Sequence, residues 1–377
     1  MSGDRRISFG AMARGAVILA IFLVVGEITA RVDDALYWKT PVLSLHSQQR
    51  LTLSDTLGTR GRPDYRYEKW RMNNLGFRGP DIEPTPRSGR TRVAILGASE
   101  TFGLQESEGA EYPHRLHVLL DSLVPGRFEV VNTALPGMTM LTMVPYYQRM
   151  VAPIKPDLVV IYPSPSFYLA TEPLPKELPP RVVVSQPRPA FGIDPTLLDS
   201  RLLDRVKNSL KSLVPVSAIT WYRDWKLARV RAAEGAEWVW QETPPDRMAL
   251  FELHLDRLVA SVAACGTRVL LVTHTNRFIQ ADDFRGPDRR HLVNLMATSY
   301  PRASERVMAN IDLDANRIIR EVAARYGATV IEAEAQIPSS SEYFVDYSHF
   351  TDLGADAMAR IIAKGVMGVA TRGAGDH

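Results

Sequence analysis

Cysteine is almost absent from this chain, which has only Cys265 among its 377 residues. A single cysteine excludes an intrachain disulfide but leaves the compartment open, because many exported proteins have none. An excess of one charge is also lacking, since 45 Lys and Arg against 42 Asp and Glu give +3 with no long basic run. No Cys, His and Glu residues cluster at metal-ligand spacing. We therefore expect no metal, no cofactor and no nucleic-acid partner.

One long apolar run stands near the N-terminus. It extends over about 20 residues, Ala11–Ala30, enough to cross a bilayer at 1.5 Å per residue. Arginines precede it, whereas Arg31 after it is offset by two acidic residues. The positive-inside rule then leaves residues 1–31 as a cytoplasmic tail and signal anchor, with the remainder outside the cytoplasm, in the periplasm if the cell is Gram-negative. A cleaved signal peptide and a buried soluble helix remain alternatives, although no clean small-x-small cleavage site follows.

Short, continuously apolar runs alternate with helix-like spacers from Val93 onward. Such runs are typical of parallel strands buried on both faces. The pattern predicts a three-layer α/β/α sandwich around a mostly parallel five-stranded sheet. The expected strands contain 93–96, 130–131, 158–161, 269–272 and 329–331.

Two regions interrupt this alternation. Residues 32–90 have no sustained period and are expected to form a juxtamembrane linker before a domain at 91–369. Within that domain, residues 171–245 begin with clustered prolines and continue with helical stretches around Leu202–Leu213 and Ile219–Ala233. We interpret them as an insertion near the edge where the strands' carboxyl ends lie, the side on which open α/β sheets bind ligands.

Three residue types at this edge suit nucleophilic chemistry. Ser99 follows the first strand, where its hydroxyl can attack and nearby amides can support negative charge, although a helix N-cap is the simpler alternative. His349 follows Asp346 by three residues, so the carboxylate can bond Nδ1–H and leave Nε2 as a base. Alone, His349 would be read as an ordinary surface histidine. Together the three provide a nucleophile, a base and a carboxylate that orients the base.

Four sequence blocks resemble, in order, those of the SGNH (GDSL) hydrolase superfamily in its membrane-anchored bacterial form. The blocks are Asn74-Leu75-Gly76-Phe77-Arg78-Gly79, Ile95-Leu96-Gly97-Ala98-Ser99-Glu100-Thr101-Phe102-Gly103, Val130-Val131-Asn132-Thr133-Ala134-Leu135-Pro136-Gly137 and Asp346-Tyr347-Ser348-His349-Phe350-Thr351-Asp352-Leu353-Gly354. The resemblance implies a flavodoxin-like sheet and a catalytic triad of Ser99, His349 and Asp346. It also implies an oxyanion hole formed by the N–H groups of Ser99 and Gly137 with a third donor.

The chain departs from the family pattern at two positions. Ala98 stands where the first block usually has an aspartate, and the third oxyanion donor, usually an asparagine, aligns with Ser166 or, less well, Ser164. A serine hydroxyl reaches less far than a carboxamide, which predicts a weakened hydrolase. Gly137 is equally consistent with a plain turn.

The resemblance implies a membrane-anchored serine esterase that removes O-acyl groups, from a cell-envelope carbohydrate in our interpretation. His274, just beyond the fourth strand, is expected to contact the substrate or to have a structural role. An O-acyltransferase acting on an exopolysaccharide or other envelope glycan is one alternative. A catalytically silent carbohydrate-binding or assembly subunit is another, and the sequence does not indicate an oligomeric state.

Overall fold

The computed structural model describes residues 9–43, 48–55, 58–178, 200–278 and 287–372. The chain divides into two compact units, which we describe separately. The first contains residues 1–51, 66–69 and 184–216, and the second contains residues 52–65, 70–183 and 217–377.

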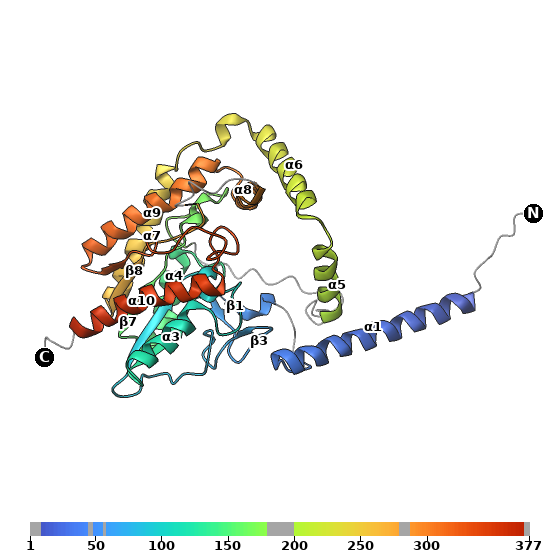
Figure 1. The fold of residues 1–377 in the computed structure, drawn as a ribbon, viewed down its shortest axis with the longest axis horizontal. Helices are drawn as coiled ribbons and strands as arrows, with labels where there is room; N and C mark the ends of the chain where they lie inside the picture. Colours follow the sequence, from blue (N-terminus) through green and yellow to red (C-terminus); the bar gives the residue numbers. More distant parts are fainter. Residues whose placement is uncertain (1–8, 44–47, 56–57, 179–199, 279–286, 373–377) are drawn as a thin grey trace, which may run out of the picture. The chain divides into compact units, whose positions relative to one another are not determined.

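A five-stranded parallel sheet forms the centre of the second unit (Figure 1). Its strands are β5 (Thr91–Leu96), β6 (Phe128–Asn132), β7 (Leu158–Ile161), β8 (Arg268–Val272) and β9 (Thr329–Ile331). Their spatial order is β6-β5-β7-β8-β9, and every neighbouring pair is parallel. This confirms the predicted strands and their parallel arrangement, which their continuous apolar character favoured, and the flavodoxin-like sheet that the resemblance implied.

Helices cover both faces of the sheet, as predicted for a three-layer sandwich. On one face α3 (Tyr112–Leu123) and α10 (Asp352–Arg372) pack together over a core that includes Val93, Val160 and Leu270. On the other face α7 (Pro245–Ala263) and α9 (Glu305–Arg325) pack against each other and against β8. Helix α4 (Met140–Tyr146) packs on α7. Gly327, with φ of +60°, follows the C-cap Tyr326 of α9 as its C′ residue.

Smaller elements complete the second unit. They are β1 (Thr52–Asp55), β2 (Gly58–Gly61), β4 (Trp70–Arg71), α2 (Ser99–Phe102), η2 (Tyr147–Val151), η3 (Ala152–Ile154), η4 (Pro165–Leu169), α6 (Val216–Glu234, from Ser217 onward), η7 (Ala236–Trp238) and α8 (Pro287–Ser299). β1 and β2 form an antiparallel pair. The Arg78 N–H donates to the Asn132 carbonyl at the end of β6, so this part of the predicted linker packs beside the sheet.

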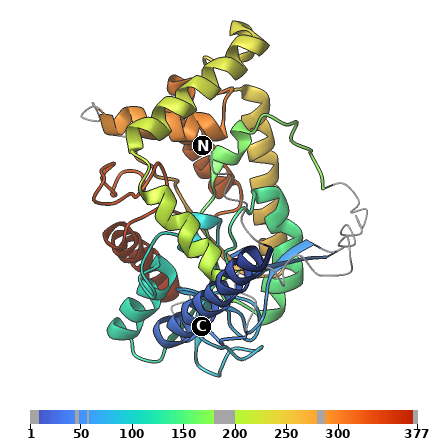
Figure 2. The ribbon, with the colours of Figure 1, turned by 90° about the vertical axis from the view of Figure 1, so that its right-hand side faces the viewer.

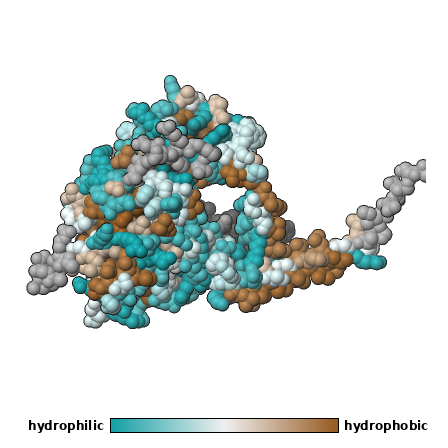
Figure 3. Space-filling model, in the orientation of Figure 1, coloured by the Kyte–Doolittle hydropathy of each residue, from teal (hydrophilic) through white to brown (hydrophobic). Residues whose placement is uncertain are grey.

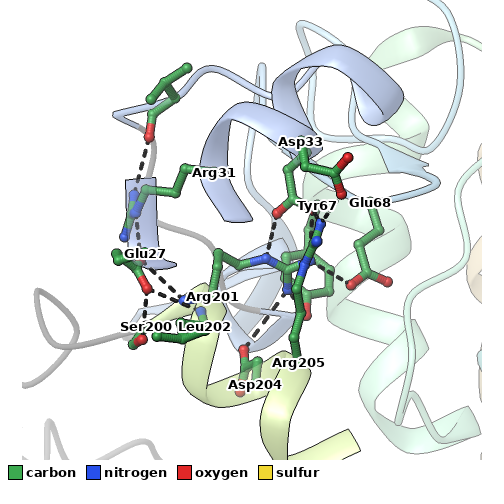
Figure 4. A network of polar contacts seen from close by, with 12 residues as sticks. Glu27, Arg31, Asp33, Tyr67, Glu68, Ser200, Arg201, Leu202, Asp204 and Arg205 are labelled. Atoms are coloured by element: carbon green, nitrogen blue, oxygen red, sulfur yellow. Dashed lines mark hydrogen bonds and ion pairs between the residues drawn. The ribbon is translucent and has the colours of Figure 1, made fainter. Parts of the chain in front are cut away.

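The first unit contains α1 (Phe9–Trp38), η1 (Gln48–Leu51), β3 (Arg66–Tyr67) and α5 (Arg201–Ser212). Within α1, Met12–Trp38 is long and apolar enough to cross a membrane, and its most apolar window has a mean hydropathy of 2.0. Only 6% of its most apolar window is buried, so α1 is not the buried helix of a soluble core. A signal sequence would share these properties. Polar contacts join α1 to α5 (Figure 4).

Candidate active site

Ser99 lies at the carboxyl end of β5, as the first residue of the one-turn helix α2. The turn requires Gly97, because a Cβ there would lie 1.8 Å from Thr101 Oγ1. The N-cap of α2 is Ala98, without a side-chain capping bond, so the interpretation of Ser99 as a helix cap is wrong. The Ser99 hydroxyl instead donates to Glu100 Oε2 at 3.3 Å.

His349 and Asp346 form the dyad expected from their spacing. Nδ1 of His349 lies 2.8 Å from Oδ2 and 3.0 Å from Oδ1 of Asp346. The N–H groups of Ser348 and His349 also donate to Oδ1, at 3.0 and 2.9 Å, which holds the carboxylate in the turn. Because Nδ1–H donates to Asp346, Nε2 is the nitrogen that can accept a proton. Nε2 is buried and has no hydrogen-bond partner among the residues that the structure describes.

Glu100 links the loops that carry Ser99 and His349. Its side chain is buried, with 3% of the residue exposed, and accepts a hydrogen bond from Ser99. Its other oxygen, Oε1, accepts from the hydroxyls of Ser164 and Ser348, each at 3.1 Å. A single carboxylate therefore joins Ser99 to the residue that precedes His349. Sequence reasoning missed this role, although Glu100 stands inside the block that was recognised.

The charges around His349 favour its protonated form. Burial opposes protonation, but the hydrogen bond to Asp346 and the charges of Glu100, Asp346 and Glu106 raise the pKa of His349 to about 9. Burial likewise opposes ionisation of Asp346, yet its bond to His349 lowers the pKa of that carboxyl below its usual value. Burial raises the pKa of Glu106 to about 7. A pKa of about 9 favours the imidazolium at neutral pH, with both ring nitrogens protonated, so Nε2 becomes able to accept a proton mainly in alkaline solution.

Two backbone N–H groups suit the oxyanion hole that the resemblance implies. Those of Ser99 and Gly137 donate no hydrogen bond to any described residue. Gly137 has a φ of +78°, a conformation that favours glycine, in the loop between β6 and α4. The candidate third donors point to different partners: Ser164 donates to Glu100, whereas Ser166 accepts a hydrogen bond from Tyr300 at 3.4 Å.

His274 forms a second histidine–carboxylate pair at the end of β8. It is buried, and its Nδ1 lies 2.6 Å from Asp312 Oδ1 on α9. Asn316 holds its backbone, accepting from the N–H and donating to the carbonyl, while Tyr162 stacks on its ring with centroids 5.0 Å apart. Burial alone would lower the pKa of His274, but Asp312, with Glu100, raises it. The pattern of one histidine after a strand gave no sign of Asp312 or Asn316 on a distant helix.

The Nε2 atom of His274 is buried and has no hydrogen-bond partner within the described ranges. This atom is therefore the one that could contact a ligand. The charges of His349 and Glu100 both affect the pKa of His274, so the two histidines and Glu100 belong to one polar cluster. In the part of the chain that the structure describes, no three His, Cys, Asp or Glu side chains gather closely enough to hold a metal ion.

No family model and no curated protein matches this sequence. Among solved structures, similar folds include LAE5, an α/β hydrolase enzyme from the metagenome of Lake Arreo, Spain. The identity is 16%, the match covers 73% of this chain and 95% of LAE5, and the TM-score is 0.42. A catalytic mutant of Axe2, an acetylxylan esterase from Geobacillus stearothermophilus, matches at 12% identity over 74% and 95% of the two chains, with a TM-score of 0.43. These likenesses are too distant to bear on activity, which depends on the geometry of the site itself.

Proposed function

We propose that this protein is a serine esterase of SGNH type that cleaves O-acyl esters. The observation that carries the proposal is the Asp346–His349 dyad, whose Nε2 has no partner among the described residues and which Glu100 links to Ser99 through the Ser348 hydroxyl. A hydroxyl, an oriented imidazole and free backbone N–H groups are the parts that acyl transfer requires. The motif order that resembles the family supports the same assignment.

In the proposed reaction, Ser99 Oγ attacks the acyl carbonyl carbon as His349 Nε2 takes the hydroxyl proton. Asp346 holds the imidazole and stabilises its positive charge. The N–H groups of Ser99 and Gly137, with the hydroxyl of Ser166 or Ser164, receive the developing oxyanion. The protonated His349 then returns its proton to the leaving alcohol, and water repeats the sequence on the acyl-enzyme. Before attack, the Ser99 hydroxyl must turn from Glu100 towards His349.

The proposal places the enzyme outside the cytoplasm, held to the membrane by α1, with a cell-envelope carbohydrate as the acyl carrier. The length and apolar character of α1 and the arginines that precede its apolar run support this arrangement. A boundary at about residue 90, with an insertion at 171–245, remains our proposal for the domain organisation. His274 Nε2 is the proposed contact for substrate.

A catalytically silent binding subunit is the second candidate. Two observations favour it: Ser99 donates to Glu100 rather than to the base, and a pKa of about 9 keeps His349 protonated at neutral pH. A protonated imidazole cannot accept the serine proton.

A fluorophosphonate probe separates the two candidates, because it reacts covalently with an activated serine. We expect the detergent-solubilised protein at pH 9 to be labelled on Ser99, as mapped by peptide mass spectrometry. Labelling should be lost in His349→Ala but kept in His291→Ala, whose histidine lies on α8 outside the cluster. A folded protein that stays unlabelled at pH 9 would favour the silent subunit. If labelling occurs, product analysis with a sugar acceptor distinguishes hydrolysis from transfer.

A further inference from the structure

Helix α5 exposes an apolar face. Leu203, Val206, Leu210 and Leu213 recur at intervals of three and four residues, so they share one side of the helix. Leu203 is 61% exposed, Leu210 60% and Leu213 76%. A contiguous exposed apolar face of this kind marks an interaction surface rather than ordinary scatter.

The start of α5 is fixed to α1. Glu27 accepts hydrogen bonds from the Ser200 hydroxyl at 2.7 Å and from the N–H groups of Arg201 and Leu202, at 3.2 and 3.0 Å (Figure 4). Glu27 thus satisfies amide groups at the first turn of α5 and complements the helix dipole there. Leu202 packs directly against Gly26, where an added Cβ would meet its Cδ2 at 2.9 Å. The register of α5 along α1 is therefore fixed.

Buried ion pairs reinforce this junction about two turns further along α1, at Asp34. Arg201 donates to Asp34, both nearly fully buried, and also to Glu68 at 2.9 Å and to the Tyr67 hydroxyl at 3.0 Å (Figure 4). Arg205 adds a second contact to Asp34 at 2.7 Å. The side of α5 that carries these arginines is opposite to the apolar face. Because the arginines hold α5 to α1 from that side, the residues that the structure describes leave the apolar face exposed.

The junction lies at the level where α1 changes from apolar to charged. Glu27 is three residues before the end of the apolar run at Ala30, and Asp34 is four residues beyond it. Helix α5 leaves this point to the side of α1 instead of running along it (Figures 1 and 2). Brown apolar surface covers much of α1 and continues along the adjoining side of α5 (Figure 3). A helix that leaves a membrane span sideways at its polar end is placed where it can lie along the bilayer surface.

The positively charged side chains of α5 also suit a position at the bilayer surface. Lys207 and Lys211 both lie beyond one edge of the apolar face, are exposed, and form no ion pair with any described residue. Long lysine side chains can keep their stems on apolar surface and place the ammonium at lipid phosphates. Helices that lie in the interface combine an apolar face with cations at its border in this way.

We propose that α5 is an interfacial helix: its apolar face enters the headgroup region of the bilayer that α1 spans, and its lysines bind anionic headgroups. The inference rests on the proposed membrane anchoring by α1. It adds a second membrane contact that fixes the first unit about the anchor axis, because a span alone can rotate freely.

Cysteine labelling in vesicles tests this proposal, since the exposed Cys265 is the sole native cysteine. In full-length Cys265→Ser protein, a label on Leu210→Cys reports the environment of the apolar face. A label on Leu203→Cys reports the same environment at a second position. Asn208→Cys is the matched control, because Asn208 is exposed on the opposite side of the helix. Phe22→Cys reports α1 independently. Each variant carries an environment-sensitive NBD label in vesicles of phosphatidylcholine and phosphatidylglycerol.

We expect the labels at 210 and 203 to emit at shorter wavelength than the label at 208 and to be quenched at least twofold more by lipids with spin-labelled acyl chains. If a quencher dissolved in the aqueous phase quenches the labels at 210 and 208 equally, while the label at 22 stays protected, the interfacial helix is contradicted and the anchor is retained. Protection at 210 that persists in detergent and increases with protein concentration would instead assign the face to a second copy of the chain. Loss of protection at 22 would remove the anchor, and the inference with it.

Discussion

Glu100 is the residue that most changes the expected chemistry of the site. It is buried, it accepts the Ser99 hydroxyl, and its charge contributes to the raised pKa of His349. A base must be neutral to accept a proton, so Glu100, together with Asp346 and Glu106, moves the pH at which the proposed esterase works upwards. Ser99 and His349 themselves could be predicted from sequence because each stands in a recognisable motif. Glu100 could not, since nothing in the order of residues shows that its carboxylate reaches Ser164 and Ser348.

The raised pKa of His349 predicts an alkaline pH profile. We expect kcat/KM for a short-chain aryl ester to rise with pH up to about 9, where His349 loses its proton, and then to level off. In Glu100→Gln the amide keeps a hydrogen-bond acceptor but removes a negative charge, so the inflection should move to lower pH. Glu321→Gln, at an exposed position on α9, is the control and should leave the inflection in place. An inflection near pH 9 in all three proteins would contradict the electrostatic role of Glu100.

The two candidate serines after β7 make opposite predictions for the third oxyanion donor. If Ser166 is the donor, Ser166→Ala should lower kcat by about 10-fold or more with little change in KM, because the bond forms chiefly in the transition state. Ser164→Ala should then act only through its bond to Glu100. Steady-state kinetics on both variants identify which serine is the third oxyanion donor. If Ser164→Ala lowers kcat while Ser166→Ala leaves it unchanged, the alignment is shifted by two residues.

Among the elements, the strands were the most predictable. Each of the five has a continuous apolar run, which a strand buried on both faces requires, and all five occur where the sequence predicts them. The segment around Arg78 was harder to interpret, because isolated bridges and buried side chains leave no period in the sequence. Arg78 is buried, pairs with Glu111 at 3.0 Å and donates to the carbonyls of Phe102 and Gly103. It thereby ties residues 74–79 to the turn that carries Ser99.

Removal of Arg78 should destabilise the second unit strongly. Arg78→Ala leaves Glu111 buried without its partner, which should cost about 3–5 kcal/mol of unfolding free energy. The Phe102 and Gly103 carbonyls then keep only the long bonds from Asn132 Nδ2 and Trp70 Nε1, at 3.5 and 3.3 Å. Arg317→Ala, which breaks the exposed pair with Glu321, should cost about 0.5 kcal/mol or less. Urea unfolding of the detergent-solubilised protein, followed by near-ultraviolet circular dichroism, measures both. Similar small losses for the two variants would show that the buried pair does not hold this segment.

At the scale of the whole molecule, the sequence predicted an apolar span, an α/β domain and a helical insertion. The region of that insertion contributes α5 to the first unit and, from Ser217, α6 to the second. Periodicity predicted both helices but not their partners, because an amphipathic pattern states only that one face is apolar. The contact between Arg201 and Asp34 joins residues 167 positions apart, and no local signal in the sequence marks such a pair.

The central claim is that Ser99 and His349 act together as nucleophile and base in one esterase site. Turnover of a short-chain aryl ester at pH 9 by the purified full-length protein tests it most directly. The account predicts that Ser99→Ala and His349→Ala each reduce kcat by about 10³-fold or more, that the double variant is no worse than either, and that all three keep the native circular dichroism spectrum. Folded single variants that turn the ester over at the native rate would contradict the claim.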